Sequence, residues 1–323
     1  MNRDIRGCAA VVIGGTGSLG RRICAALLGA GASRVAAVSR HGGPAVSGVR
    51  LLRADLLGDD SRALSHLLAD SDVVVNAAGA GWRGTPEQMV SAHTVLVERL
   101  LRLVPPHTRL VQIGTVHEYG EILRCEAAGE DHPEQPSTPY GRTKLMGSRS
   151  VLEAAAEGRT DAVVLRVTNV CGPGVSAASF LGSLIKQLRQ LPPGGQLDLT
   201  VTPDMRDFID IRDVADAVVR AANAPVTGLV INIGRGEVHA VPTVAEMMTE
   251  AAGFPRRRVR MRVAAMSGRP GGGGCTKVDV RRAQAVLGWS PTIRLEDSLR
   301  DQWKAAAPPG ELMVCRQDGS RDG

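Results

Sequence analysis

A tyrosine and a lysine lie one helical turn apart in the stretch Tyr140-Gly-Arg-Thr-Lys144. Residues at i and i+4 of a helix share a face, so the two side chains can meet. A free phenol has a pKa of about 10, whereas a neighbouring ammonium favours the phenolate. We therefore expect Lys144 to lower the pKa of Tyr140 and the pair to act in acid–base catalysis. Thr115 adds a hydroxyl that could hydrogen-bond a substrate carbonyl, or could instead satisfy a backbone group at a strand end.

A glycine-rich turn follows the apolar stretch 8–13 and precedes residues with helical apolar spacing. A strand, a tight turn and a helix start form an anion site, because the first N–H groups of the helix are unpaired and its dipole favours negative charge. The pattern is G-x-x-G-x-x-G rather than the more familiar G-x-G-x-x-G, and its place favours dinucleotide binding over a purely structural turn. The expected cofactor-binding residues of this turn are Gly14, Thr16, Gly17, Ser18, Leu19 and Gly20.

The end of the second expected strand bears on the choice of cofactor. Folds that bind NAD place a carboxylate there for the ribose 2′-hydroxyl, but this chain has Ser39 and Arg40. A hydroxyl and a guanidinium can bind a 2′-phosphate, which favours NADP(H); the alternative is that Arg40 is a solvated arginine. Asp55, followed by Leu56, could hold the adenine edge or cap a helix. The other expected cofactor contacts are Asn76, Ala77, Ala78, Gly79 and, at the nicotinamide ribose, Lys144.

Alternating strand and helix patterns must position these residues. Strands are expected at 8–13, 34–40, 49–53, 72–76, 109–114, 162–167 and 229–232, and helices at 59–69, 85–103, 140–156 and 209–222. Such alternation predicts an α/β fold with a doubly wound parallel sheet (Rossmann) that binds its ligand at the carboxyl ends of the strands. After about residue 168 strands and helices no longer alternate regularly. Further helices are expected from 242, at 279–287 and at 295–303. This part predicts a smaller C-terminal substrate-binding lobe.

The expected domain boundaries follow from the point at which strands and helices stop alternating regularly. Residues 1–168 form the dinucleotide-binding domain, and 207–235 return to it. Residues 169–206 and 236–305 form the substrate lobe, which includes a glycine-rich loop at 268–274. Residues 306–323 are rich in Pro, Gly, Asp and Ser and are expected to form a disordered tail.

The composition narrows the possible partners. The formal net charge is +6, but the basic residues are scattered and only 2% of residues are aromatic, so we expect no nucleic-acid partner. A positive surface suits an anionic substrate or cofactor equally well. No apolar stretch is long enough to span a membrane. The 6 cysteines form no C-x-x-C pair and no metal site, which is typical of free thiols in a reducing cytoplasm.

Taken together, the motifs resemble those of the extended short-chain dehydrogenase/reductase family, also called NAD-dependent epimerases/dehydratases, which act on nucleotide sugars. The resemblance runs through residues 8–305 and includes Arg166 with Asn169, and the stretch from Arg206 to 214. It implies that the threonine, tyrosine and lysine named above form a catalytic triad. It also implies that Asn169 lies near the nucleotide of the sugar and that Arg206 contacts its phosphates.

Within the family, the stretches 112–120 and 138–145 are most similar to 4-ketoreductases, which reduce a dTDP-4-keto-6-deoxyhexose. Dehydratases of the family follow the threonine with an Asp-Glu pair, whereas this chain has Val116 and His117. Epimerases retain a tightly held NAD, whereas a 2′-phosphate site at Arg40 suits a cofactor that arrives reduced and leaves oxidised. We therefore expect NADPH-dependent reduction of a C4 ketone in deoxysugar (antibiotic) biosynthesis. A nucleotide-sugar 4-epimerase with bound NAD and a non-catalytic NADP-binding regulator are the alternatives.

Several expectations concern contacts beyond the triad. His117 and Glu118 follow the fifth strand and could contact the substrate, orient the tyrosine or simply form a polar loop. The glycine run near 271 departs from the family pattern, which leaves Lys277 or Arg269 to hold the nucleotide base. The helices at 85–103 and 140–156 could form a homodimer, as they do in relatives, or could serve the core of the monomer.

Overall fold

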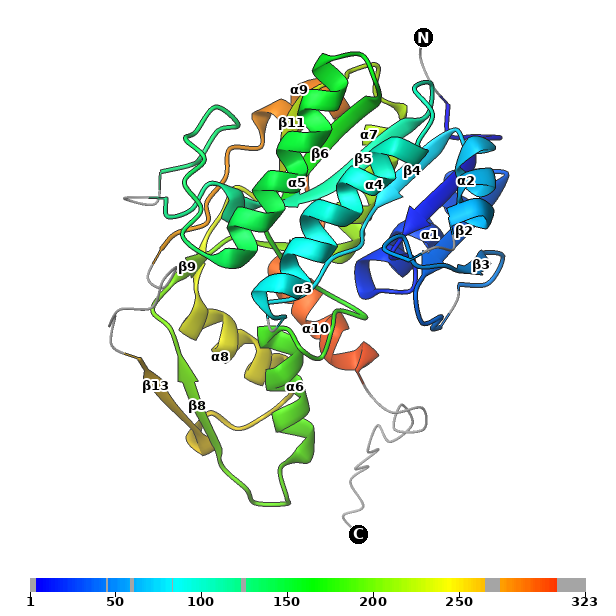
Figure 1. Cartoon of the computed structure of the whole chain (residues 1–323). Coiled ribbons are helices and arrows are strands. Elements are labelled where there is room, and N and C mark those ends of the chain that lie inside the picture. Colours follow the sequence, from blue (N-terminus) through cyan, green and yellow to red (C-terminus); the bar gives the residue numbers. More distant parts are fainter. Residues whose placement is uncertain are drawn as a thin grey trace.

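A seven-stranded parallel sheet forms the centre of the molecule, in the order β11-β6-β5-β4-β1-β2-β3 (Figure 1). The computed structural model describes residues 4–44, 46–58, 61–82, 84–122, 126–264 and 274–306. The strands are β1 (Ala9–Ile13), β2 (Arg34–Ser39), β3 (Arg50–Arg53), β4 (Val73–Asn76), β5 (Arg109–Thr115), β6 (Asp161–Val167) and β11 (Leu229–Ile233). The predicted doubly wound fold is confirmed.

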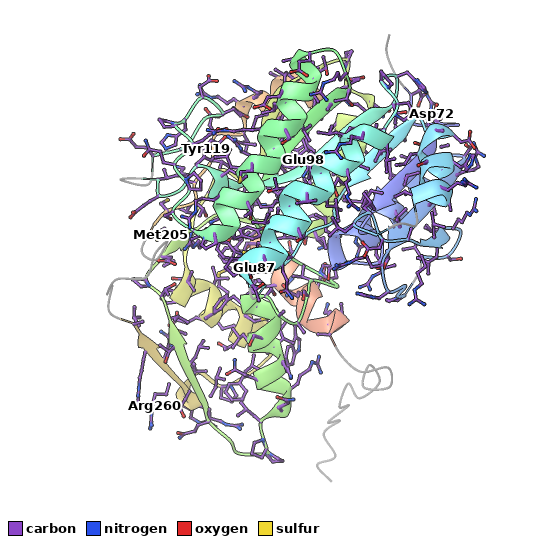
Figure 2. All side chains as sticks on the ribbon, viewed as in Figure 1. Asp72, Glu87, Glu98, Tyr119, Met205 and Arg260 are labelled. Atoms are coloured by element: carbon purple, nitrogen blue, oxygen red, sulfur yellow. The ribbon has the colours of Figure 1, made fainter. Side chains whose placement is uncertain are left out.

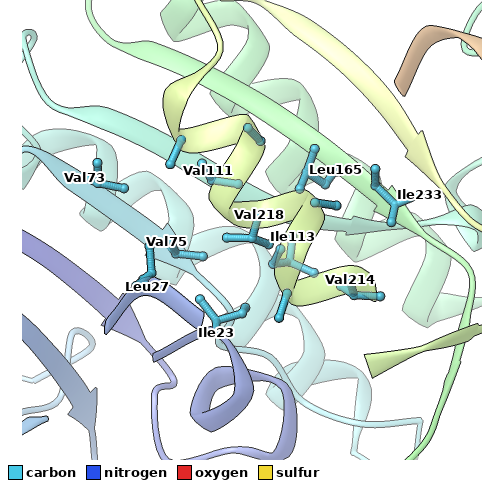
Figure 3. Packing of buried hydrophobic residues seen from close by; sticks show 14 of the residues in the cluster. Ile23, Leu27, Val73, Val75, Val111, Ile113, Leu165, Val214, Val218 and Ile233 are labelled. Carbon is cyan, nitrogen blue, oxygen red and sulfur yellow. The ribbon is translucent and has the colours of Figure 1, made fainter. Parts of the chain in front are cut away.

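Apolar side chains on both faces of the central strands explain why helices cover both sides of the sheet. In β1, Val12 packs into one core cluster, whereas Val11 and Ile13 pack into the other. The cluster that contains Val12 also receives side chains from the helices α1 (Ser18–Gly29), α7 (Ile211–Asn223) and α9 (Arg281–Leu287). Figure 3 shows part of it. Helices α2 (Ser61–Ala69), α4 (Leu96–Leu103) and α5 (Pro139–Ala156) cover the opposite face.

The helix expected at 85–103 is interrupted in its middle. It consists of α3 (Pro86–Val90), a π-helical turn η1 (Ser91–Val95) and α4. Its start was predictable, because Thr85 caps it in a capping box with Gln88. The widened turn places His93 in the interior, where its side chain is buried. A π-helical turn inside an α-helix often marks a functional site.

A smaller lobe lies beside the sheet and has its own core. It contains α6 (Phe180–Gln190), α8 (Val241–Ala251), α10 (Leu295–Ala305) and the paired strands β8 (Leu197–Val201) and β13 (Val259–Val263) (Figure 1). Two short pairs connect it to the sheet region: β7 (Asn169–Cys171) with β10 (Phe208–Asp210), and β9 (Met205–Arg206) with β12 (His239–Ala240). The 3₁₀ turns η2 (Val116–Glu118) and η4 (Arg256–Arg258) complete the described elements.

The sequence did not predict α6 or any of these six lobe strands. Strands of two to five residues give too little periodic signal to be recognised. The exact division into domains stays a prediction. One part of it differs from the packing, because Ala283, Leu287 and Trp289, expected in the smaller lobe, pack in the cluster formed by α1 and α7.

The cysteines differ from expectation at one position. Cys24 and Cys171 are free thiols, as predicted, whereas Cys275 is disulfide-bonded, so the prediction of free thiols is wrong at that position. Among the described helices, none combines the length and apolar character needed to cross a membrane. Several expectations lie outside the described residues: those for Cys125, Cys315 and Arg269, most of the 268–274 loop, and the tail from 307.

Candidate active site

A cavity of about 660 Å³ opens at the carboxyl ends of β1, β2 and β4. Helix α3 lies at this end of the sheet. Asp72, which directly precedes β4, marks the opposite end, and Figure 2 shows it far from Glu87 in the first turn of α3. Most of the residues predicted to bind the cofactor line this one cavity. They are Gly14, Thr16, Gly17, Ser39, Arg40, Asp55, Leu56, Ala77, Ala78 and Gly79.

The glycine turn has the geometry that a dinucleotide needs. Gly14 has a φ of +77°, and a Cβ there would lie 2.8 Å from backbone atoms of Ala78. A Cβ at Gly20 would lie 2.2 Å from the carbonyl oxygen of Gly14, so the helix can approach the turn only without a side chain. Helix α1 begins after Gly17 with no side-chain cap. Its uncapped N-terminus fits a pyrophosphate.

The rim of the cavity holds the residues expected near the ribose of the adenosine. Arg40 is exposed, and the Ser39 hydroxyl donates to the carbonyl of Gly42 at 2.8 Å. Arg53, which no sequence motif marks, ends β3, and its Nε donates to the carbonyl of Arg40 at 3.2 Å. A second guanidinium therefore lies beside the expected 2′-phosphate position.

Asp55 is at the end of the strand β3 rather than at the start of a helix. Its Oδ1 accepts a hydrogen bond from the backbone N–H of Leu57 at 3.0 Å, which closes a local turn. Helix α2 begins only at Ser61. The alternative that Asp55 caps this helix is therefore wrong, while its predicted contact with adenine stays a prediction.

Five of the predicted cofactor residues do not line the cavity: Ser18, Leu19, Gly20, Asn76 and Lys144. Asn76 is fully buried, and its side-chain amide donates to Gln112 at 2.9 Å, so it supports the strand end instead of contacting a ligand. Gly20 is likewise buried, and it serves the close packing of the turn. The Asn76 side chain is therefore engaged within the protein, and backbone contacts of Gly20 with a cofactor stay a prediction. Ser18 and Leu19 lie at the open helix start without lining the cavity, and their backbone roles stay predictions.

The three predicted catalytic residues come from two adjacent elements. Thr115 ends β5, and its side chain hydrogen-bonds that of Tyr140 in the first turn of α5. The N-cap residue Thr138 fixes this turn by accepting from the backbone N–H of Gly141 at 3.1 Å. The Lys144 ammonium is buried and donates to the carbonyl of Ile113 at 2.5 Å.

The electrostatics around Tyr140 differ from expectation. Burial, together with the negative charge of Glu118, raises the pKa of Tyr140 to about 12, although the hydrogen bond with Thr115 opposes this. Burial lowers the pKa of Lys144, and here the negative charge of Glu118 acts against burial. The prediction that Lys144 lowers the pKa of Tyr140 is therefore wrong in this structure, because burial of the phenol and the nearby carboxylate dominate.

Three further rings surround the phenol. The indole of Trp82 stacks on the Tyr140 ring, with centroids 4.3 Å apart. His93 and His117 meet it edge-on at 5.3 and 6.2 Å. The sequence analysis missed Trp82 and His93. An aromatic residue in the glycine-rich turn after β4 was a usable signal for Trp82, whereas no sequence signal marks the π-helical turn that turns His93 inward.

The hydrogen bonds of His93 join two elements. Its Nδ1 lies 2.9 Å from the hydroxyl oxygen of Thr143. Its Nε2 lies 3.0 Å from both the backbone nitrogen and the carbonyl oxygen of Ala80, so the geometry is compatible with either neutral tautomer. Burial and the charge of Lys144 lower the pKa of His93 to about 4. The neutral ring thus links the loop that carries Trp82 to the helix that carries Tyr140.

On the other side of the phenol lie the residues expected to bind the sugar nucleotide. His117 and Arg206 line a small cavity together, and burial, reinforced by the Arg206 charge, lowers the pKa of His117 to about 3. Arg206 forms an ion pair with Asp204 at 2.6 Å. Asn169 lies beside them but donates to the carbonyl of Asp207 at 2.9 Å and to Thr276 at 3.1 Å. Their contacts with a substrate stay predictions.

Glu118 does not face the cleft. Its side chain is fully buried and forms an ion pair with Arg166 at 2.8 Å. The expectation that it contacts substrate is wrong, because no ligand in the cleft can reach it. Among the described residues, no cluster of three or more His, Cys, Asp or Glu side chains could hold a metal ion.

A model of the NAD dependent epimerase/dehydratase family matches residues 10–234. The chain belongs to this family. A relative from Kitasatospora kifunensis, named dTDP-6-deoxy-L-talose 4-dehydrogenase (NAD(P)(+)), is 36% identical over 302 residues, which cover 91% of this chain and 94% of that protein. The predictions of the family and of an NAD(P)-dependent oxidoreductase are confirmed.

Solved structures of the family are similar along almost the whole chain. UDP-glucuronic acid 4-epimerase from Bacillus cereus, in complex with UDP-glucuronic acid and NAD, matches with a TM-score of 0.79 and 27% identity, covering 92% of this chain and 98% of that one. dTDP-glucose 4,6-dehydratase from Bacillus anthracis, in complex with NAD, matches with a TM-score of 0.80 at 18% identity over 92% of this chain and 96% of that one. The second likeness concerns the fold alone.

Proposed function

We propose that this chain reduces the C4 ketone of a dTDP-4-keto-6-deoxyhexose to the 4-hydroxy sugar with NADPH. The observation that carries the proposal is the hydrogen-bonded pair of Thr115 and Tyr140. The ring of Tyr140 packs against His93, which in turn contacts Ala80 in the lining of the dinucleotide cavity. The relative named as a dTDP-6-deoxy-L-talose 4-dehydrogenase supports both the sugar class and the position of the reaction, since a dehydrogenation reverses a ketone reduction.

The residues around the cavity fit NADP(H). The open N-terminus of α1 suits the pyrophosphate, and Arg40 with Arg53 suits a 2′-phosphate. Lys144 is the residue that would hold the nicotinamide ribose. When bound, this cofactor would supply the hydride that reaches C4.

The chain itself has to deliver the proton. A pKa of about 12 keeps Tyr140 a neutral phenol at physiological pH, which is the form that donates a proton to the oxygen at C4. The hydroxyl of Thr115 would hydrogen-bond the same oxygen as its negative charge develops. The rings of Trp82, His93 and His117 crowd the phenol and keep water away from the proton transfer.

Replacing Tyr140 by Phe tests this assignment. The ring and its stack on Trp82 remain, but the donated proton is lost, so kcat for a dTDP-4-keto-6-deoxyhexose should fall by about 10²-fold or more. NADPH oxidation measured by absorbance gives the rate, and NMR of the product gives the new configuration at C4. A variant with the rate of the unaltered enzyme would show that Tyr140 is not the acid.

A nucleotide-sugar 4-epimerase is the second candidate, favoured by the 27% identity to UDP-glucuronic acid 4-epimerase. The two functions differ in their cofactor balance. The reductase oxidises one NADPH per sugar, whereas an epimerase interconverts 4-hydroxy sugars with a dinucleotide that stays bound. Purified enzyme that carries NAD and equilibrates a dTDP-6-deoxyhexose with its C4 epimer, without added cofactor, would replace the reductase proposal.

A further inference from the structure

The indole of Trp82 lies over the catalytic phenol and is still open to solvent. Its ring stacks on that of Tyr140 with an interplanar angle of 27° and meets the ring of His117 edge-on, with centroids 4.6 Å apart. Trp82 is nevertheless 53% exposed. A large aromatic surface left open beside reacting groups is available to a ligand.

The loop that carries Trp82 is held on both sides of the indole. Before it, the backbone nitrogen and oxygen of Ala80 lie 3.0 Å from Nε2 of the buried His93. After it, a capping box fixes the start of α3. Between these two anchors the backbone N–H of Gly84 donates to the carbonyl of Gly81 at 3.0 Å, which closes a turn around Trp82. The fold therefore positions the indole before any ligand arrives.

The contacts of the indole place it on the sugar side of the site. Trp82 does not line the dinucleotide cavity. Its edge-on partner His117 instead lines the small cavity that also contains Arg206, the residue expected at the phosphates of the nucleotide sugar. A hexose whose diphosphate meets Arg206 and whose C4 oxygen meets Tyr140 therefore lies beside the indole.

We infer that Trp82 is a specificity-determining residue: its indole packs against the C6 methyl group of the sugar and so selects a 6-deoxyhexose over a hexose with a hydroxyl at C6. The inference rests on the proposed ketone reduction, because that reaction is what brings C4 to Tyr140.

The chemistry of an indole explains the selection. The C6 group is attached to C5, the ring atom next to C4, so a sugar that presents its C4 oxygen to Tyr140 brings C6 close to the ring stacked on that phenol. A methyl group packed on the indole gains free energy by leaving water. A hydroxyl in the same place finds no acceptor, because an indole has only one N–H donor at its edge, and its own donor is left unpaired. The other neighbour of C4 carries the same group in both sugars and does not distinguish them.

Two sugars that differ by one hydroxyl test the inference. dTDP-6-deoxy-L-talose is the sugar in the name of the Kitasatospora relative, and dTDP-L-talose adds only the hydroxyl at C6. Isothermal titration calorimetry of the full chain, without added dinucleotide so that no turnover occurs, gives the Kd of each. We expect the 6-deoxy sugar to bind about 10- to 100-fold more tightly. Trp82→Ala should remove most of this ratio, and Trp82→Phe, which keeps an aromatic face, should retain most of it.

Two controls show where the indole acts. Met146→Ala removes an apolar side chain of similar exposure, 51%, from the helix that carries Tyr140 and should leave the ratio unchanged. The Kd of dTDP itself should be the same in all variants. Because Trp82 is exposed and lies in a turn, we expect its variants to fold.

The possible results separate the inference from the proposed function. Equal affinity for the two sugars in the unaltered protein, or a ratio that Trp82→Ala leaves unchanged, overturns the inference. A loss of affinity for dTDP as large as that for the 6-deoxy sugar also overturns it, since the indole would then act on the nucleotide. A preference that depends on Trp82, in a protein that neither reduces the ketosugar nor oxidises the 6-deoxy sugar, overturns only the proposed function.

Discussion

Two arginine side chains at or near the cavity rim carry the proposed preference for NADP(H). Arg40 is exposed and lies at the end of β2, where a carboxylate would repel a 2′-phosphate. Arg53, at the end of β3, donates from its Nε to the backbone carbonyl of Arg40, which brings a second guanidinium close to this part of the rim. Charge-assisted hydrogen bonds from arginine to phosphate are among the stronger polar contacts that proteins form.

Reversing the charge at Arg40 should therefore weaken the preference for NADPH. We expect Arg40→Asp to lower kcat/KM for NADPH by about 10- to 100-fold and to change that for NADH much less. Arg50→Asp, at the other end of β3, is the matched control and should leave both values unchanged. Steady-state kinetics with the two cofactors give the answer, and an unaltered NADPH preference in Arg40→Asp would refute the 2′-phosphate assignment.

Among the elements, the π-helical turn η1 makes the stability of the fold depend on pH, because it buries His93. It places neutral His93 between Ala80 and Thr143, with a pKa lowered from 6.5 to about 4. The folded protein therefore resists a proton that the unfolded chain accepts, so stability falls as the pH falls from 6.5 to 4. His93 alone should account for about 3 kcal/mol of this loss.

The titration of Asp207 changes the stability of the fold in the opposite direction over much of the same pH range. Burial raises its pKa from 3.8 to about 6, so its contribution to stability is lost as the pH rises through that window and regained as it falls. His93→Gln should reduce the loss of stability between pH 7 and 5, and Asp207→Asn should increase it. Urea unfolding at the two pH values measures both, and identical pH dependence in all three proteins would contradict the assignment.

How much the sequence could predict also differs between elements. The glycine turn and the pair Tyr140 and Lys144 were recognisable, because local spacing determines them. The pKa of Tyr140 was not predictable, since it depends on burial and on Glu118, whose orientation is set by contacts with β6 and α5. Short lobe strands such as β9 and β12 were missed because they exist only as partners of each other.

At the scale of the whole molecule, the two lobes are joined through α7. Asp213 on this helix accepts hydrogen bonds from the backbone N–H groups of Thr292 and Ile293 at 3.2 and 3.1 Å, and from the Thr292 hydroxyl at 2.9 Å. The indole N–H of Trp289 donates to the Asp213 carbonyl at 3.1 Å. The segment that leads from α9 into α10 is thus fastened to the main sheet.

Removing this carboxylate should destabilise the whole chain. Asp213→Ala leaves three partly buried donors without their acceptor and should lower the free energy of unfolding by about 2 kcal/mol. Asp216→Ala, on the exposed face of the same helix, loses only an i,i+4 ion pair and should cost about 0.5 kcal/mol or less. Thermal and denaturant unfolding compare the two, and equal effects would show that Asp213 does not fasten the segment.

The stack of Trp82 on Tyr140 has a practical consequence. Of the 3 tryptophans, Trp289 is buried in the core and Trp303 lies under Arg189, whereas Trp82 is 53% exposed and stacks on Tyr140. Its fluorescence should respond when a ligand enters, and a reduced nicotinamide nearby would take up its emission by energy transfer. Stopped-flow recording of this signal should reveal whether dinucleotide or sugar arrives first, with no label attached.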